Sequence, residues 1–432
     1  MSPPRPLLAP RSEDEAGRIT IYYDGEPIPA RDGEPISAAL LSAGILATTR
    51  SPKYRRPRGP YCLRGECGSC QVRIGGLPNV RACTTLARDG LAIESQNHWG
   101  PPGLDPTPIV DRVFRGGMDH HHLMVRPRIA NEMMQRVARS LTGFGTLADA
   151  DAIPPPAEHR SHRPEVLVIG AGPAGRRAAL ALEAAGLEVL AIDRRDRITL
   201  DRLTLDRADE GPPPRGLLAD TGVFAAYPHE QIFAAASAPL VDGAPRLHTI
   251  HARHVVLATG ARDPLPLFPQ TDLPGVVSAR GLAQLHERCD VRLIASTVIV
   301  GEGALAESLA AALGGERVAP DRVVKILGDG EVTGIQLVDR TVACRLVALA
   351  PTPAPTHELA AQAGARLTWS GDGFAIACDA DGRVEIAPEH PRPWTLWACG
   401  DLRGYLGREA AAADGERVAG AIAAAIAEEA RR

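Results

Sequence analysis

Lysine is nearly absent from this chain of 432 residues, and aromatic residues make up only 4% of it. The lysines are Lys53 and Lys325, so arginine supplies almost all the positive charge, and 48 basic against 52 acidic residues give a formal net charge of −4. A balance of this kind provides no general attraction to nucleic acid or to anionic lipid. The composition therefore disfavours a polyanion-binding function.

Long hydrophobic runs are also missing. No segment reaches the about 18 apolar residues of a membrane span, and the start of the chain has no apolar stretch typical of a signal peptide. We therefore expect a cytoplasmic protein with no membrane span. There is no nucleophile beside a base, no pair of carboxylates and no spacing typical of a metal hydrolase, so no catalytic residue is predicted.

The patterns that are present predict an α/β multidomain protein. A hairpin around Asp24, a helical stretch that stops near Gly44 and later strand-like segments are typical of a β-grasp domain. From residue 165, a strand, a tight turn, a helix and a strand predict a Rossmann-like domain. The expected parts are a flexible tail at 1–17, a ferredoxin-like domain at 18–96, a connecting segment and linker at 97–162, a dinucleotide-binding domain at 163–285 and 392–432, and a truncated NAD-like insert at 286–391.

Four of the eight cysteines crowd into one short segment with the spacing C-x4-C-x2-C-x12-C. They are Cys62, Cys67, Cys70 and Cys83. Three thiolates in one tight loop and a fourth from the next segment are typical of the ligands of a 2Fe-2S cluster. Gly65 and Gly68 lie between the ligands, where the backbone must bring amide groups close to sulfide. The spacing therefore predicts a 2Fe-2S site.

Two other interpretations of these cysteines are weaker. A zinc site with four cysteine ligands is disfavoured by the four-residue gap, and a redox dithiol at Cys67 and Cys70 is disfavoured by the other two thiols nearby. The remaining cysteines stand singly in apolar stretches, typical of core residues. The triplet His120 to His122 could bind a metal, but three adjacent residues cannot all face one point, which favours a loop or interface role.

A first glycine turn, Gly170, Gly172 and Gly175, directly follows an apolar strand in the pattern G-x-G-x-x-G. A pyrophosphate can lie on the helix N-terminus that such a turn opens. Asp193 closes the following strand, where a carboxylate can accept hydrogen bonds from ribose hydroxyls. These residues predict a dinucleotide site, and the alternative is a turn that serves only the packing of helix and strand.

A second glycine turn consists of Gly301, Gly303 and Ala306. Only about 20 residues separate it from the strand-like segment 323–327, so we expect no complete strand–helix–strand unit with its acidic residue here. Packing is therefore favoured over NAD binding. On this basis, electrons are not expected to come from NAD(P)H.

Two further segments resemble the two-dinucleotide-binding flavoproteins, namely a strand that ends in Ala-Thr-Gly at 258–260 and a late strand that ends in Gly-Asp at 400–401. The resemblance implies that the dinucleotide is FAD and that Thr259 and Gly260 line its site. It also implies that Gly400 and Asp401 belong to the site, with Asp401 facing the ribityl chain. The helix after Asp401 would direct its N-terminus toward the flavin.

The whole order of domains, with the segments 50–59 (RSPKYRRPRG), 96–99 (QNHW) and 258–285, resembles the alpha subunits of sarcosine oxidase. Opine oxidases, hydroxyproline dehydrogenases and hydrogen cyanide synthase belong to the same family. The family implies a partner subunit of the amino-acid oxidase type that oxidises a small amine or amino acid. The chain departs from the family by a shorter segment after Asp193, by a missing Gly-Gly-Gln stretch and by the absence of an aminomethyltransferase-like half.

These observations together predict an electron-transfer subunit that carries FAD and one 2Fe-2S cluster and works beside a substrate-oxidising flavoprotein in a hetero-oligomer. A flavin takes up two electrons and releases them singly, while the cluster carries one. Two alternatives remain at this point. One is an NAD(P)H-dependent ferredoxin-type reductase, and the other is a scaffold subunit that keeps only the cluster.

Overall fold

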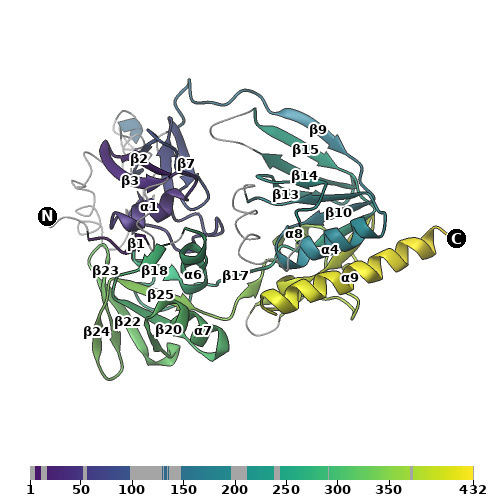
Figure 1. Ribbon diagram of the computed structural model, residues 1–432. Coiled ribbons are helices and arrows are strands. Elements are labelled where there is room, and N and C mark those ends of the chain that lie inside the picture. Colours follow the sequence, from purple (N-terminus) through teal and green to yellow (C-terminus); the bar gives the residue numbers. More distant parts are fainter. Residues whose placement is uncertain are drawn as a thin grey trace. The chain divides into compact units, whose positions relative to one another are not determined.

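The chain forms two compact units in the computed structural model, drawn in Figure 1. Unit 1 comprises Met1–Ile153 and Leu265–Pro351, and unit 2 comprises Pro154–Pro264 and Thr352–Arg432. The structure describes residues 5–10, 17–51, 56–97, 129, 131–133, 135, 147–195, 212–237, 244–289, 291–369 and 373–431. His120 to His122 lie outside these residues. Among the described helices, none is both long and apolar enough to cross a membrane.

The first part of unit 1 is a β-grasp sheet, as the sequence predicted. Asp24 and Gly25 both have positive φ, which is the geometry of a tight hairpin turn between β2 (Arg18–Tyr23) and β3 (Glu26–Arg31). The helix α1 (Ile36–Ser42) packs its apolar side chains on this sheet, and Ile21, Leu40 and Val72 are fully buried. In sheet order the strands are β3 (Glu26–Arg31), β2 (Arg18–Tyr23), β8 (Ala92–Glu94), β6 (Gln71–Ile74) and β7 (Leu77–Arg81).

The second part of unit 1 is the insert, residues 265–351, built on a parallel sheet. Two helices, α6 (Ala279–Arg288) and α7 (Gly303–Leu313), follow strands of this sheet directly. A three-stranded antiparallel sheet of β22 (Val323–Gly328), β23 (Val332–Leu337) and β24 (Thr341–Ala343) lies between β21 (Glu316–Val318) and β25 (Leu346–Ala350) in the chain. In order, the parallel strands are β18 (Val276–Ser278), β25 (Leu346–Ala350), β20 (Thr297–Gly301) and β21 (Glu316–Val318).

The insert differs from its expected form in two ways. Its boundaries are 265–351 rather than 286–391, because β18 pairs with β25 and so draws α6 into the insert sheet. The expectation that the second glycine turn lacks a complete strand–helix–strand unit was wrong, since β20, α7 and β21 form one with parallel strands. The three-residue strand β21 has only one buried side chain, so its sequence carried no strand pattern.

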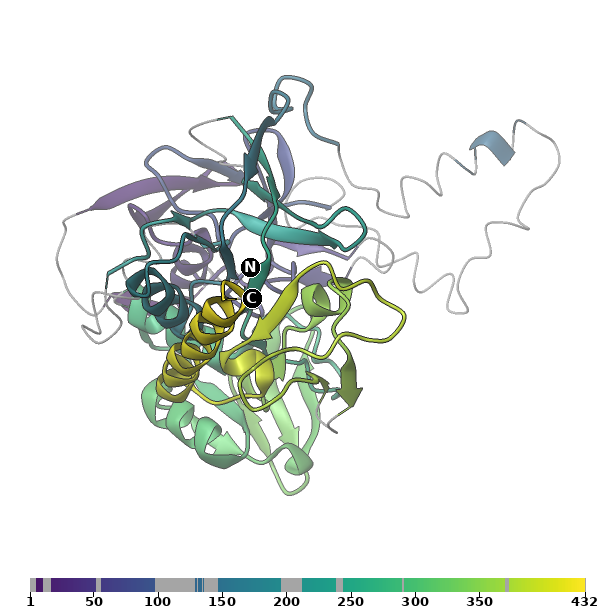
Figure 2. The same cartoon turned by 90° about the vertical axis from the view of Figure 1, so that its right-hand side faces the viewer.

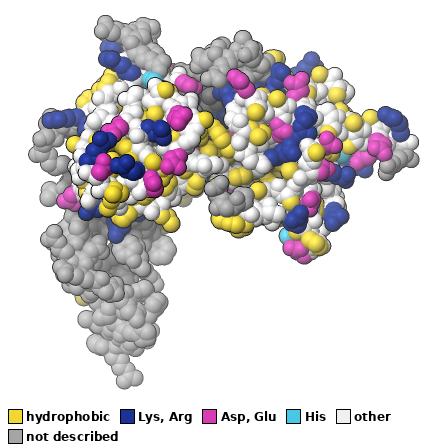
Figure 3. All heavy atoms as spheres, turned by 90° about the horizontal axis from the view of Figure 1, so that it is seen from below, with side chains coloured by type: hydrophobic (Ala, Val, Ile, Leu, Met, Phe, Trp, Pro, Cys, Tyr) yellow, Lys and Arg dark blue, Asp and Glu magenta, His cyan; other side chains and the backbone are white. Residues whose placement is uncertain are grey.

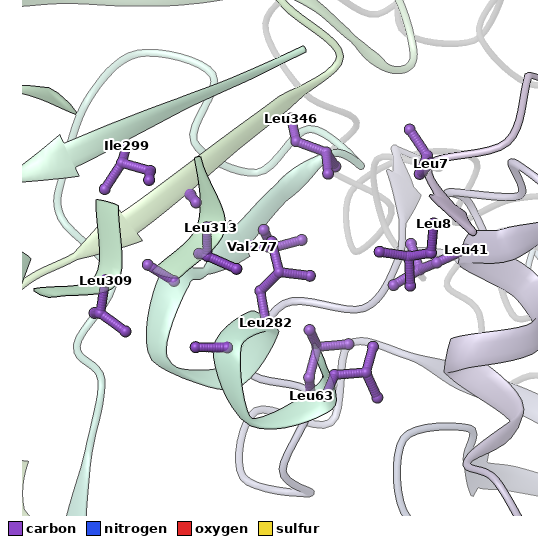
Figure 4. Close-up of a cluster of buried hydrophobic side chains, with 14 of the residues drawn as sticks. Leu7, Leu8, Leu41, Leu63, Val277, Leu282, Ile299, Leu309, Leu313 and Leu346 are labelled. Atoms are coloured by element: carbon purple, nitrogen blue, oxygen red, sulfur yellow. The ribbon is translucent and has the colours of Figure 1, made fainter. Parts of the chain in front are cut away.

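The N-terminal segment is part of the fold rather than a flexible tail where the structure describes it. Strand β1 (Leu8–Pro10) pairs antiparallel with β19 (Val291–Leu293), and Leu7 has no exposed surface. Figure 4 shows Leu7 and Leu8 in one apolar cluster with side chains from both the ferredoxin-like domain and the insert. The labelled members are Leu7, Leu8, Leu41, Leu63, Val277, Leu282, Ile299, Leu309, Leu313 and Leu346. A common core therefore joins these two parts of unit 1.

Unit 2 contains a five-stranded parallel sheet with the helices α4 (Pro173–Ala184) and α9 (Arg408–Glu429) side by side, as Figures 1 and 2 show. The apolar runs of these strands are buried on both faces, which is typical of a parallel sheet covered by other elements. In order the strands are β12 (Leu217–Leu218), β11 (Val189–Ile192), β10 (Val166–Ile169), β16 (His254–Leu257) and β29 (Thr395–Ala398).

A second sheet of unit 2 includes a strand from the expected linker. Strand β9 (Glu158–His162) pairs parallel with β15 (Arg246–Ile250), so the linker ends before β9. Its five residues are polar and mostly exposed, and an edge strand of this kind has no apolar alternation to reveal it. In order the strands are β13 (Gly222–Tyr227), β14 (Ile232–Ser237), β15 (Arg246–Ile250) and β9.

Small elements complete unit 2. The strand β17 (Ala261–Arg262) pairs with β26 (Ala354–Pro355), and β27 (Leu367–Trp369) pairs with β28 (Phe374–Ile376). The short helix α8 (Glu358–Gln362) lies between these pairs in the chain.

On the face drawn in Figure 3, basic and acidic side chains are interspersed among the coloured residues, which agrees with the balanced charge of the sequence.

Candidate cluster and dinucleotide sites

The cluster loop, residues 59–70 of unit 1, turns sharply around the first three cysteines. Leu63, Gly65 and Gly68 have positive φ values of 55°, 79° and 65°. A Cβ atom added to Gly65 would lie 2.6 Å from the Cγ2 atom of Thr84, so a larger residue would push the loop away from the segment that carries Cys83. The loop is also held by Arg81, whose guanidinium donates to the Gly65 carbonyl at 2.8 Å.

Backbone amides in the cluster loop point at cysteine sulfur. The amides of Arg64, Glu66 and Cys67 donate to the Sγ atom of Cys62 at 3.5, 3.2 and 3.4 Å. The Gly65 amide donates to Sγ of Cys83 at 3.2 Å. Amide donors of this kind stabilise negative charge on thiolate ligands and tune the potential of a cluster.

The four predicted cysteines are brought together in the structure. Hydrogen bonds with the Cys67 and Cys83 thiols hold the pKa of Cys62 well below its usual range. The pKa of Cys83 is raised, mainly by its contacts with the Cys62 and Cys70 thiols. Cys62, Cys70 and Cys83 are buried, while Cys67 is exposed and its Sγ lies 3.0 Å from Oγ of Ser69. Four adjacent sulfur donors with amides aimed at them fit a 2Fe-2S cluster.

The first glycine turn of unit 2 is as tight as its sequence pattern predicts. Gly170 has a φ of 101°, and an added Cβ would lie 2.4 Å from the carbonyl oxygen of Ala258. An added Cβ at Gly175 would lie 1.8 Å from the carbonyl oxygen of Gly170. Gly172 is the N-cap residue of α4 and has no side chain that could accept a hydrogen bond. The amides of the first helical turn are therefore available to an anionic group. This arrangement fits a dinucleotide pyrophosphate.

Asp193 lies at the end of β11, beside the first glycine turn, and is 5% exposed. Its Oδ2 atom accepts the Ala171 amide and Nη2 of Arg195, each at 2.7 Å, and its Oδ1 atom accepts the amide and Nε of Arg195 at 2.8 and 2.9 Å. Burial acts to raise the pKa of this carboxyl, but the charge and hydrogen bonds of Arg195 hold it below its ordinary value. The carboxylate is therefore ionised and fixed beside the turn.

Arg195 was not singled out from the sequence. A Cβ atom added to Gly172 would lie 3.7 Å from Nη2 of Arg195, so the guanidinium reaches over the glycine turn. The only signal for it in the sequence is that two arginines, Arg194 and Arg195, directly follow Asp193. A cation at this position adds positive charge beside the predicted pyrophosphate site.

The remaining predicted residues surround the same turn. The Thr259 hydroxyl donates to the Thr356 carbonyl at 2.9 Å, and Gly260, with a φ of 72°, accepts the Thr356 amide. A Cβ atom added to Gly400 would lie 2.5 Å from Cβ of Ala174 in α4. Asp401 accepts the amides of Leu406 and Gly407 at 2.9 and 3.1 Å and so orders the segment before α9.

Asp414 in α9 is a further residue that the sequence analysis missed. Its Oδ2 atom accepts the Gly400 amide at 2.8 Å, and its Oδ1 atom accepts Nη1 of Arg403 at 2.7 Å. Through these two contacts, Asp414 fixes the position of the Gly-Asp turn at residues 400–401. A polar residue in an alanine-rich helix was the signal that could have identified it.

Two family models match the chain. Residues 16–98 match the 2Fe-2S iron-sulfur cluster binding domain, and residues 164–346 match the pyridine nucleotide-disulphide oxidoreductase family. Sarcosine oxidase subunit alpha of Rhizobium meliloti (strain 1021) is 28% identical over 304 residues, which are 63% of this chain and 31% of that protein. The chain thus spans about a third of the length of this relative.

Two further similarities cover different shares of the chain. Hydrogen cyanide synthase subunit HcnA of Pseudomonas aeruginosa is 32% identical over 80 residues, 18% of this chain and 76% of that protein. The crystal structure of L-proline dehydrogenase from P. horikoshii matches with a TM-score of 0.68 and 20% identity, covering 98% of this chain and 76% of that one. This structural likeness supports the fold alone.

The matches confirm the predicted fold class and the predicted cofactors. The chain is an oxidoreductase with a 2Fe-2S domain and a flavoprotein domain for FAD. The assignment of individual residues to these cofactors stays a prediction, although the structure brings each set together. The cluster set is Cys62, Cys67, Cys70 and Cys83, and the FAD set is Gly170, Gly172, Gly175, Asp193, Thr259, Gly260, Gly400 and Asp401.

Proposed function

The chain belongs to the family that includes sarcosine oxidase subunit alpha and hydrogen cyanide synthase subunit HcnA, and from this premise we propose that it is the electron-transfer subunit of a heteromeric amine or amino-acid dehydrogenase or oxidase. Its partner would be a substrate-oxidising flavoprotein subunit of the amino-acid oxidase type. The observation that carries the proposal is the presence, in one chain, of a four-cysteine loop and a complete dinucleotide turn.

Each set of residues has a defined role in this proposal. FAD and the cluster, when bound, supply two-electron uptake and one-electron transfer respectively. Cys62, Cys67, Cys70 and Cys83 would hold the cluster, with loop amides offsetting the charge of the thiolates. The open amides at the start of α4 would bind the pyrophosphate of FAD, while Asp193 would orient the adenosine ribose.

The exposure of one cysteine of the cluster loop supports a role in electron transfer. Cys67 is exposed, whereas the other three cysteines of the cluster loop are buried. Transfer between proteins requires a cofactor to approach the surface on at least one side. The Cys67 side of the loop provides such an approach, while the buried cysteines keep the rest of the site away from water.

The experiment that tests this function begins with anaerobically purified protein. Iron, acid-labile sulfide and released flavin are measured on one sample, and we expect about two iron, about two sulfide and about one FAD per chain. The variant Cys70→Ser should lose iron and sulfide but keep FAD, because Cys70 belongs to unit 1 and the dinucleotide turn to unit 2. Iron without flavin would support the scaffold alternative, and zinc in place of iron would contradict the redox function.

The source of electrons is tested in the same preparation. Adding a small amine or amino acid should reduce the flavin only when the substrate-oxidising partner is present. Rapid loss of flavin colour with NADH alone would instead support the reductase alternative. A stopped-flow record of the flavin absorbance separates these two results.

A further inference from the structure

The cluster loop lies against the start of α6 in the insert. A Cβ atom added to Gly281 would lie 2.2 Å from the carbonyl oxygen of Cys62 and 3.3 Å from Cβ of Leu63. The amide of Ser278 donates to the carbonyl of Tyr61 at 2.8 Å, and the Ser278 side chain accepts the Gly281 amide at 2.8 Å as the cap of α6. The Tyr61 carbonyl is thus hydrogen-bonded by Ser278, and the next carbonyl of the cluster loop, that of Cys62, lies close against the backbone of Gly281.

The start of α6 is at the carboxyl edge of the insert sheet, because Ser278 is the last residue of β18. The second glycine turn follows β20 and lies at the same edge, two strand spacings away, or about 10 Å. In a dinucleotide site, the adenosine ribose binds at the end of the strand after the glycine turn, which here is β21. The nicotinamide half would then extend the other way, over β25 toward β18 and the cluster loop.

The second glycine turn itself fits a dinucleotide poorly. Glu302 is the N-cap residue of α7 and is exposed, so its carboxylate would face a pyrophosphate at that helix start. No acidic side chain ends β21, which is followed by Ala319 and Pro320. Arg317 in β21 donates to the Gly301 carbonyl at 3.4 Å and pairs with Glu307 at 3.6 Å, so its charge is engaged within the insert.

We propose that the carboxyl edge of the insert sheet is a cradle that positions the 2Fe-2S cluster, with Gly281 as the positioning residue, and that it is not a nicotinamide site. The absence of a side chain at Gly281 lets α6 meet the backbone of Cys62 directly. The buried contact of Leu63 with the insert core fixes the residue beside this ligand. This inference rests on the proposed cluster ligands.

The test compares two identical substitutions of helical glycines, Gly281→Ala and Gly420→Ala. Gly420 in α9 has nothing within 4 Å of an added Cβ, so it is the matched control. In Gly281→Ala we expect shifted g-values of the dithionite-reduced cluster and about tenfold faster loss of iron to a chelator, as when groups supporting a metal ligand are removed. FAD content should stay unchanged, and Gly420→Ala should match the parent protein in all three measurements.

The outcomes separate this inference from the proposed function. A parent protein that holds the cluster, with identical spectra and iron loss in both variants, would overturn the cradle and leave the electron-transfer function standing. A parent protein without iron would overturn both. If Gly281→Ala also loses FAD or folds poorly, the decisive measurement is on the parent protein: NADH should not reduce its flavin, and rapid reduction by NADH would overturn the inference together with the proposed function.

Discussion

The two glycine turns both join a parallel strand to a helix, but they differ in their third position and in the charged residues around them. In the first turn, the third position must be glycine, because an added Cβ at Gly175 would lie 1.8 Å from a backbone oxygen. In the second turn the same position is Ala306, which is buried without displacing the helix. The first turn has Asp193 at the end of the next strand, whereas the second has Glu302 at the helix start. The comparison teaches that glycine spacing specifies a strand-to-helix connection, and that the difference in dinucleotide binding proposed for the two turns depends on their charged neighbours.

The largest expected effect is the loss of FAD on substitution of Gly175 by alanine. The added methyl group must open the turn, because the atom that it meets is the Gly170 carbonyl rather than a movable side chain. We expect purified Gly175→Ala protein to contain less than about a tenth of the parent FAD and to lose about 1–3 kcal/mol of stability in unit 2. Flavin released per chain and thermal unfolding measure the two effects.

The corresponding control is Ala306→Gly in the second turn. It should leave FAD content unchanged and cost about 1 kcal/mol of stability in the insert, from the lower helix propensity of glycine. Equal loss of flavin in both variants would remove the distinction between the turns.

The next largest effect concerns Asp193, because the second turn has no acidic residue at the corresponding position. Asp193→Ala would leave the buried Ala171 amide and the Arg195 guanidinium without their acceptor. The variant would also lack the carboxylate proposed to accept from the ribose, and because a hydrogen bond to a charged group is worth about 1.5–3 kcal/mol, FAD affinity should fall by about tenfold to a hundredfold. Fluorescence titration of the apoprotein with FAD measures this change, and Asp321→Asn, at an exposed residue of the short helix after β21, should have no effect on it.

A pH dependence should follow from the same carboxylate. Because the pKa of folded Asp193 is depressed, its contribution to stability is complete above the unfolded value of about 3.9 and is lost as pH falls through the folded pKa. Unit 2 of the parent protein should therefore lose stability below about pH 4, and Asp193→Asn should show a flatter profile. Thermal unfolding from pH 3 to 7 measures both profiles, and parallel curves would contradict the role given to Arg195.

The smallest effects distinguish two glycines of α9. An added Cβ at Gly415 would lie 2.1 Å from the Ala174 carbonyl in α4, whereas Gly420 is open. Gly415→Ala should lower the free energy of unfolding by about 1–3 kcal/mol, while Gly420→Ala should raise it by up to about 1 kcal/mol. Denaturant unfolding of unit 2 measures the pair, and a gain in stability for both would show that α4 and α9 can separate without cost.

Much of the fold and both candidate sites could be predicted because their signals are local. Asp24 and Gly25 specify a turn by themselves, and the four cysteines carry their own spacing. The first glycine turn was equally visible, since an apolar strand precedes it and Asp193 follows at the expected distance. In each case the residues that determine the geometry are neighbours in the chain.

The parts that could not be predicted depend on distant partners. Strand β9 is polar and exposed and exists because β15 provides hydrogen bonds for it. The boundary of the insert depends on the pairing of β18 with β25, which no local pattern indicates. The contact between Gly281 and Cys62 joins residues from two domains. A single glycine in a helical pattern does not by itself indicate such a contact.

The pairing of Leu8 with Leu293 has a consequence for biosynthesis. At a synthesis rate of about 5–20 residues per second, the ribosome needs roughly 15 to 60 seconds to make the partner of β1 after β1 itself. Until then, Leu7, Leu8 and Leu63 cannot be buried, because the side chains of the insert that complete their apolar cluster have not been synthesised. Maturation of the iron site should therefore wait for the insert to be translated, although all four cysteines leave the ribosome much earlier.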